Sequence, residues 1–231
     1  GGAGWSEMLR GSGARARFAT KYLAAAIEPV RGELTSVDHW LAFDAENDRE
    51  PDGWESYPSW VAAQSDAPCP RHIEESDDCY QMYTSGTTGR PKGAVIAHSA
   101  VTANTVQAQN SYHPTGDDCS LVVAPLYHAA AGIVSFTGVA QGGSLYIQED
   151  FIPSEAVRAM SEEGITSALL VPAMIQACLV AVPDVAERKY DSLSSVVYGA
   201  SPIAAETLRR AIEVFGCGFM QDRKSTRLNS S

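Results

Sequence analysis

Apolar and polar residues alternate with two different periods along this chain, and the period predicts where strands and helices lie. Phe18, Tyr22, Leu23 and Ile27 recur on roughly one helical face, which predicts a helix over 14–29. Short apolar runs predict strands, and longer amphipathic stretches predict helices between them. Strands are expected at 39–43, 80–84, 94–97, 121–124, 144–147, 168–171, 195–198 and 218–221, and further helices at 60–63, 100–111, 153–163, 172–180 and 203–215.

The order of these elements predicts the fold class. Strands alternate with helices through most of the chain, which indicates an α/β fold with a mostly parallel sheet flanked by helices. In such sheets, ligands bind beyond the carboxyl ends of the strands. The residues that follow each predicted strand are therefore the first place to look for chemistry.

Composition narrows the class of protein. The chain has 231 residues, 45% hydrophobic and 19% charged, which is typical of a soluble globular protein. Its net charge of −11 argues against a nucleic-acid partner, because proteins that bind nucleic acids normally have a basic patch on their surface. The most apolar stretch, 167–182, is shorter than the ~20 residues of a membrane helix, so no transmembrane segment is expected, and peripheral membrane association stays open.

The five cysteines are scattered and form no C-x-x-C pair. This pattern favours a reduced, cytoplasmic protein over a disulfide scaffold or a zinc site.

One segment concentrates groups that bind phosphate. Residues 83–93 read YTSGTTGRPKG and begin within the last two residues of the strand predicted at 80–84. The glycines permit turns whose successive N–H groups form an anion-binding nest, and the threonine and serine hydroxyls add donors. Arg90 and Lys92 supply positive charge in an otherwise acidic chain. The segment is therefore predicted to cradle a polyphosphate.

A P-loop kinase or NTPase is the alternative from a different class. Its Walker A loop needs G-x-x-x-x-G-K-[ST] running into a helix. Here Gly93 follows Lys92, and the next residues are expected to form a strand. A strand, loop and strand over 80–97 would support the first interpretation, whereas a helix beginning at Lys92 would support the NTPase.

The 83–93 segment resembles the signature loop of the adenylate-forming, or AMP-binding, superfamily. That resemblance implies the large N-terminal domain of such an enzyme, without its small C-terminal domain. It also implies ATP-phosphate contacts from one set of residues, with Lys92 providing catalytic charge: Thr84, Ser85, Gly86, Thr87, Thr88, Gly89 and Lys92.

Further motifs follow in the order that the family would require. The run 125–128, PLYH, resembles the motif that borders the acyl pocket and the thiol passage, which implies pocket roles for Tyr127 and His128 and a catalytic role for His128. The run 171–174, VPAM, resembles a motif that we interpret as packing. The turn after Tyr198 resembles the one that lies against adenine, which implies nucleotide contacts from Gly199, Ala200, Ser201, Pro202 and, on the last strand, Gln221.

The resemblance implies an acid–thiol ligase, most like a fatty-acyl-CoA synthetase of fatty acid metabolism. Such an enzyme uses ATP and Mg²⁺ to form an acyl-adenylate and takes CoA as co-substrate. An aryl-CoA ligase and a peptide-synthetase adenylation domain remain alternatives. Chain length of the acid and oligomeric state stay open.

The last ten residues depart from the family pattern. Residues 222–231 read DRKSTRLNSS, which resembles a translated sequencing adapter, so we expect 1–221 to be a partial AMP-binding domain and 222–231 to be a foreign tail. The Glu expected to organise Mg²⁺ would lie beyond Gln221, so no metal ligand is expected in this chain. We therefore expect this chain to be a non-catalytic fragment of a parent enzyme that is active.

Overall fold

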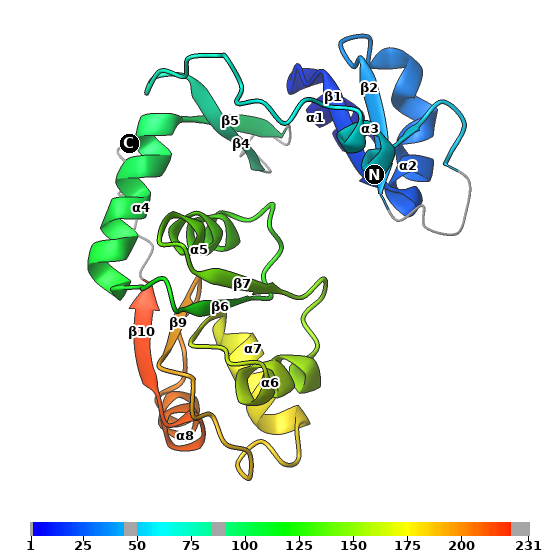
Figure 1. The fold of residues 1–231 in the computed structure, drawn as a ribbon. Coiled ribbons are helices and arrows are strands. Elements are labelled where there is room, and N and C mark those ends of the chain that lie inside the picture. Colours follow the sequence, from blue (N-terminus) through cyan, green and yellow to red (C-terminus); the bar gives the residue numbers. More distant parts are fainter. Residues whose placement is uncertain (1, 44–49, 85–90, 223–231) are drawn as a thin grey trace, which may run out of the picture. The chain divides into compact units, whose positions relative to one another are not determined.

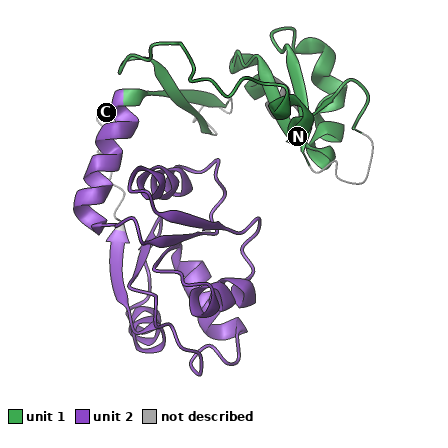
Figure 2. Ribbon diagram, in the orientation of Figure 1, with its two compact units in different colours: residues 1–98 green, residues 99–231 purple. Residues whose placement is uncertain are grey.

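The computed structural model describes residues 2–43, 50–84 and 91–222. The chain divides into two compact units, 1–98 and 99–231, and each is described by itself (Figure 2).

Unit 1 contains a small parallel sheet in the order β1-β2-β3. Its strands are β1 (Ala16–Thr20), β2 (His39–Phe43) and β3 (Glu55–Ser56), and its helical segments are α1 (Gly2–Gly11), α2 (Lys21–Ile27), the 3-10 helix η1 (Glu28–Glu33) and α3 (Tyr57–Ala62). Trp40 and Trp54 anchor its core, with ring centroids 5.2 Å apart in an edge-to-face arrangement. Aromatic pairs of this geometry add to the stabilisation from area burial.

The helix predicted over 14–29 is wrong in its first part. Residues 16–20 form β1, which pairs in parallel with all five residues of β2. The helix begins only after Thr20, whose hydroxyl accepts a hydrogen bond from the Leu23 N–H at 3.3 Å. Pairing with a distant strand therefore overrides the local helical pattern at residues 16–20. Thr20 then acts as the N-cap of α2, where the helix begins.

Two antiparallel strands complete unit 1. β4 (Asp78–Thr84) pairs with β5 (Lys92–Ala97), so the predicted strand, loop and strand are confirmed. Lys92 begins a strand, which contradicts the helix that a P-loop NTPase would place there.

Unit 2 is built on a five-stranded parallel sheet in the order β10-β9-β8-β6-β7 (Figure 1). The strands are β6 (Cys119–Val122), β7 (Ser144–Ile147), β8 (Ser167–Leu170), β9 (Ser195–Gly199) and β10 (Gly218–Asp222). The helices are α4 (His98–Tyr112), α5 (Ala129–Ala140), α6 (Pro153–Glu162), α7 (Pro172–Ala181) and α8 (Ala205–Phe215). The predicted α/β class with a mostly parallel sheet is confirmed.

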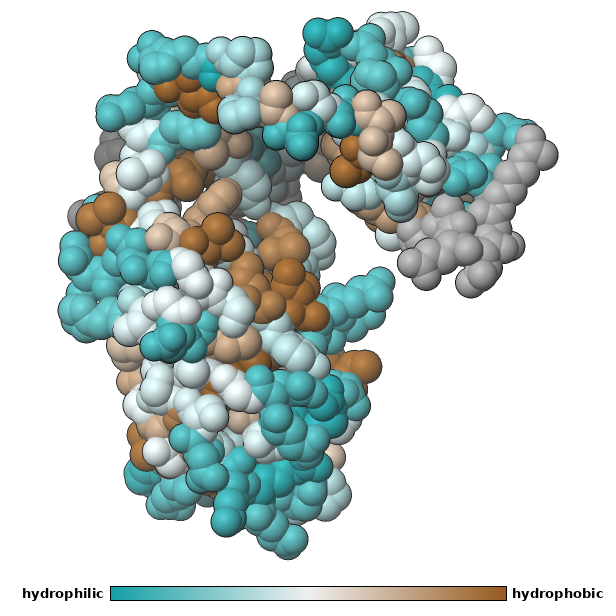
Figure 3. Space-filling view, in the orientation of Figure 1, coloured by the Kyte–Doolittle hydropathy of each residue, from teal (hydrophilic) through white to brown (hydrophobic). Residues whose placement is uncertain are grey.

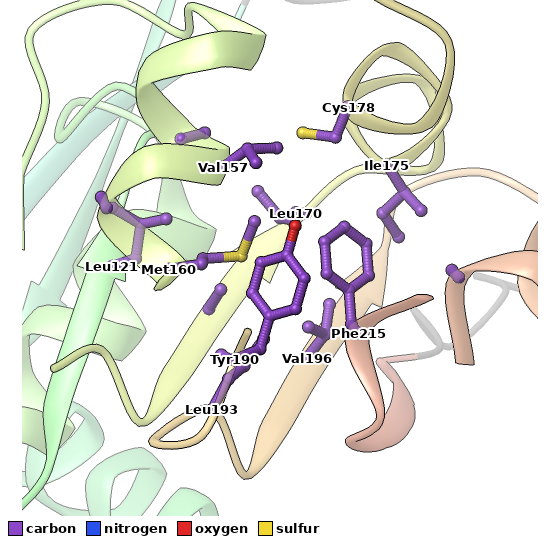
Figure 4. Packing of buried hydrophobic residues seen from close by; sticks show 14 of the residues in the cluster. Leu121, Val157, Met160, Leu170, Ile175, Cys178, Tyr190, Leu193, Val196 and Phe215 are labelled. Carbon is purple, nitrogen blue, oxygen red and sulfur yellow. The ribbon is translucent and has the colours of Figure 1, made fainter. Parts of the chain in front are cut away.

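The main core lies between this sheet and the helices α6, α7 and α8 (Figure 4). Leu121, Val196 and Ile175 are fully buried there. Burial of such side chains contributes about 1.5–3 kcal/mol each. The core fixes the strands rigidly, and with them the loops at their carboxyl ends.

Helix α5 covers the other face of the sheet, where it contacts β6, β7 and β8. The sequence pattern predicts no helix here, because α5 carries Gly132 and Gly138, which disfavour a helix. Packing explains it. A Cβ on Gly138 would lie 2.9 Å from the Leu145 side chain, so glycine lets α5 approach β7 closely.

In the part of the chain that the structure describes, no helix has the length and apolar character needed to cross a membrane.

Candidate active site

The predicted motifs of unit 2 meet at one edge of its sheet. The loop 125–128 follows β6, Val171 follows β8, the turn 200–202 follows β9, and Gln221 lies near the end of β10. Because these strands are parallel, their carboxyl ends face the same way, and the motifs gather there. Gln221 stands opposite Tyr198 in the β10–β9 pairing, next to the turn.

A cavity of about 170 Å³ opens at this edge. His128 and Pro125 form part of its wall, Val171 and Met174 another part, and the turn contributes Gly199 and Ala200. Its wall is mostly apolar, with the imidazole of His128 as the titratable group. The cavity therefore suits an apolar substrate portion held beside a polar reacting end.

His128 is held by the start of helix α5. It occupies the N-cap position with extended backbone, φ −97° and ψ 139°. Its N–H donates to the Pro125 carbonyl at 2.8 Å, and its own carbonyl accepts from the Gly132 N–H at 3.1 Å. These backbone bonds fix the residue while its side chain stays exposed at the cavity wall. Tyr127 is 82% exposed and is not part of that wall, so its pocket role stays a prediction.

The turn after β9 has an unusual backbone. Ala200 has φ 68°, a left-handed conformation that residues other than glycine seldom adopt. The preceding Tyr198 is 6% exposed and belongs to the core, which holds the strand end in place. Ser201 and Pro202 are exposed beyond it. Strained backbone at a cavity rim is a frequent feature of ligand sites, and here it coincides with the predicted adenine contact.

The predicted phosphate loop belongs to unit 1. Thr84 and Lys92 are cross-strand partners at its two ends, and both are exposed. Ser85, Gly86, Thr87, Thr88 and Gly89, together with Arg90, lie outside the described residues. The hairpin base is anchored by Tyr83, whose hydroxyl donates to the Met8 carbonyl at 3.1 Å.

Val171 and Met174 are among the cavity-wall residues that sequence reasoning missed. Val171 and Met174 come from the motif interpreted as packing, and only Pro172 between them is buried. The available signal was their position directly after a buried strand, where ligands bind in parallel sheets. Among the described residues, no three His, Cys, Asp or Glu side chains gather closely enough to hold a metal ion.

Comparison with known proteins identifies the family. The family model described as "AMP-binding enzyme" matches residues 3–222. A feruloyl-CoA synthase from Amycolatopsis is 35% identical over 160 residues, which is 69% of this chain and 32% of that protein. The medium/long-chain-fatty-acid–CoA ligase FadD8 of Mycobacterium tuberculosis is 39% identical over 140 residues, 60% of this chain and 24% of that protein. The chain thus spans about a third of the length of such relatives or less.

Solved structures share the fold. The inhibitor-bound N-terminal domain of FACL13 from Mycobacterium tuberculosis superposes with a TM-score of 0.84 at 22% identity, covering 97% of this chain and 54% of that one. An anthranilate CoA ligase, AuaEII, in complex with anthranoyl-AMP gives a TM-score of 0.80 at 20% identity, covering 97% of this chain and 43% of that one. With a family match that runs from residue 3 to residue 222, this chain belongs to the AMP-binding enzymes, the adenylate-forming family.

Proposed function

We propose that the complete protein containing this chain is an acid–thiol ligase that activates a fatty acid. In the first step, a carboxylate oxygen attacks the α-phosphorus of ATP, the bond to the β-phosphate oxygen breaks, and acyl-AMP and pyrophosphate form. In the second step, the CoA sulfur attacks the acyl carbon, loses its proton, and AMP leaves. The carboxylate is already a nucleophile, so the protein mainly positions the reactants and neutralises charge.

The observation that carries this proposal is the cavity beside His128. It joins an apolar wall, including Leu169, Leu170 and Met174, to the turn at 199–200. An acyl chain would lie against the apolar wall, with its carboxyl end directed to the turn where the family match supports a nucleotide. The similarity to FadD8 supports the choice of a fatty acid.

The residues present fit parts of this chemistry. Lys92 is an exposed cation beside the predicted phosphate loop, suited to the charge of a triphosphate. Mg²⁺, when bound, would neutralise phosphate charge, but we assign it no residue of this chain. We expect the 231-residue chain alone to show no turnover, and the proposal concerns the complete protein.

An aryl-CoA ligase is the second candidate. The 35% identity to a feruloyl-CoA synthase favours it, since that relative is named for an aromatic acid. Both candidates share the adenylation step and differ in the shape of the acid.

The test is carboxylate-dependent exchange of labelled pyrophosphate into ATP, measured on the complete protein with a panel of fatty, aromatic and amino acids. Exchange with fatty acids supports the proposal, and exchange with aromatic acids alone supports the second candidate. Transfer of amino acids to a carrier protein would reject both, and absence of exchange with every acid would remove the adenylation step.

A further inference from the structure

A second and larger cavity lies in unit 2, between α5 and the same face of the sheet. Its volume is about 250 Å³. Thr137 lines it on the α5 side, and Ser120, Ser167 and Ser195 line it near the amino ends of β6, β8 and β9. Nothing in the adenylation chemistry explains a cavity at this end of the strands, which is opposite to the end that carries the motifs.

The two cavities follow one another along one face of the sheet. Both are lined by Ala130 of α5 and by Leu169 of β8. Residues two apart in a strand share a face, so Ser167, Leu169 and Val171 form one line from the larger cavity to the smaller. The shared residues mark the junction between the cavities.

The spacing is the same on three strands. Val171 lies four positions after Ser167 and directly follows β8, and the same interval of four positions separates Ser120 from Ala124 and Ser195 from Gly199. At about 3.3 Å per residue, the path from the cavity beside His128 to the serines is roughly 13 Å long. A medium-length acid held by its carboxyl end at the turn would therefore reach the serines with its far end.

The far end of this path is polar. Ser120, Ser167 and Ser195 are register partners across β6, β8 and β9, so their side chains form a row on one face. The Ser120 and Ser167 hydroxyl oxygens are 2.8 Å apart and hydrogen-bonded. Since each hydroxyl brings one proton and two lone pairs, this bond uses only one of the two protons. Hydrogen-bonding capacity is left over at the end of a path whose middle is lined by Leu169 and Val197.

Thr137 gives an independent indication. Its side chain lines the same cavity and is 6% exposed, and its Oγ1 has no hydrogen-bond partner among the described residues. A buried hydroxyl without a partner is unfavourable, and native structures rarely keep one without a reason. A polar ligand group in this cavity would supply such a reason.

We infer that the larger cavity receives the far end of the carboxylic acid and selects acids that carry a hydroxyl group there. The inference rests on the proposed function, whose substrate class it narrows. Ser120 and Ser167 are the specificity-determining residues, and Ala130 sets the width of the passage to them.

The test compares ω-hydroxydecanoate with decanoate in pyrophosphate exchange by the complete protein. We expect kcat/KM to favour the hydroxy acid by about threefold to tenfold, the effect of one neutral hydrogen bond. The S120A/S167A variant should lose this preference, so that the ratio of kcat/KM for the hydroxy acid to kcat/KM for decanoate falls to about one. Ser144→Ala is the matched control, because Ser144 is an exposed serine of the same sheet outside both cavity walls, and it should keep the preference. The pair 4-hydroxycinnamate and cinnamate separates a phenolic from an aliphatic hydroxyl.

A second variant and a binding measurement guard against misfolding. Ala130→Phe should narrow the junction, so the ratio of activity toward decanoate to activity toward butyrate should fall by about tenfold or more. Equilibrium dialysis of the unmodified protein, carried out without ATP, measures the dissociation constants of decanoate and of ω-hydroxydecanoate. Exchange that is equal for the two members of both acid pairs, or a preference that survives in S120A/S167A, overturns the inference and leaves the proposed function standing. Preferential binding of the hydroxy acid without exchange refutes the proposed function alone.

Discussion

Replacing Phe215 by alanine should destabilise unit 2 selectively. Phe215 is the last residue of α8 and is 2% exposed. Its ring meets that of Tyr190 edge to face, with centroids 5.0 Å apart and planes at 75° (Figure 4). The Tyr190 hydroxyl in turn donates to the Val185 carbonyl at 2.8 Å. The substitution therefore removes a ring that connects α8 to the segment after α7.

The expected magnitude is about 3–5 kcal/mol, because a buried aromatic ring is lost and a cavity remains. Loss of the edge-to-face contact, worth about 0.5–1.5 kcal/mol beyond burial, favours the upper part of that range. A unit of this size should have a stability of roughly 7–20 kcal/mol, so the variant should still fold.

Two residue types report separately on the two units. All four tryptophans lie in unit 1, so tryptophan fluorescence follows unit 1 alone. Cys178 is fully buried in unit 2, and burial raises the pKa of its thiol to about 12. Alkylation of Cys178 in the native chain therefore requires opening of unit 2. Mass spectrometry of the labelled peptide should show its rate rising by roughly two to nearly four orders of magnitude in Phe215→Ala, at 1.36 kcal/mol per tenfold.

Ile212→Ala is the control, since Ile212 lies on the same helix and is 45% exposed. It should change the Cys178 labelling rate by less than about tenfold, corresponding to at most ~1 kcal/mol. Equal labelling rates in the two variants would refute the assignment of Phe215 to the core. If Phe215→Ala also shifted the unfolding transition monitored by tryptophan fluorescence, by an amount that matches the change in Cys178 labelling, the two units would unfold together.

Three further predictions concern single side chains. Lys92→Gln should weaken Mg·ATP binding by the complete protein about ten- to hundredfold, because a charge-assisted phosphate contact is lost; calorimetry should show no change for the exposed Lys189→Gln. Burial opposes ionisation of Asp118, but hydrogen bonds, foremost from Thr166, more than offset it and hold its pKa below the usual value. Its stabilisation of unit 2 is therefore complete above about pH 3.9 and is lost as the pH falls through the folded pKa. Asp118→Asn should flatten this part of an acid titration followed by far-UV circular dichroism. Thr137→Val should stabilise ligand-free unit 2 by about 1 kcal/mol in the Cys178 labelling assay, since it removes an unpaired buried hydroxyl; a destabilised variant would contradict that assignment.

An exposed apolar surface accompanies the cavities. Phe136 and Val139 of α5 and Ile147 of β7 are 38%, 65% and 55% exposed, and apolar residues gather over this part of unit 2 (Figure 3). These three side chains lie outside the core cluster that surrounds Cys178, so their exposure does not change the burial of the Cys178 thiol.

Much of the fold was encoded locally. β2 and β7 have the predicted bounds, and most other strands and helices of unit 2 lie within a few residues of them. Short apolar runs and Pro-initiated helices such as α6 and α7 are signals that neighbouring residues carry by themselves. The glycine- and hydroxyl-rich segment at 83–93 likewise identified the family before any geometry was known.

Tertiary structure decided what depends on distant partners. Residues 16–20 form a strand because β2 pairs with them, and α5 forms despite its glycines because it packs against the sheet. The serine row exists only because parallel register places Ser120, Ser167 and Ser195 side by side. In the sequence these serines are separate and unremarkable. Sequence therefore determined the elements and the family, whereas the three-dimensional pairing of strands determined which residues share a cavity.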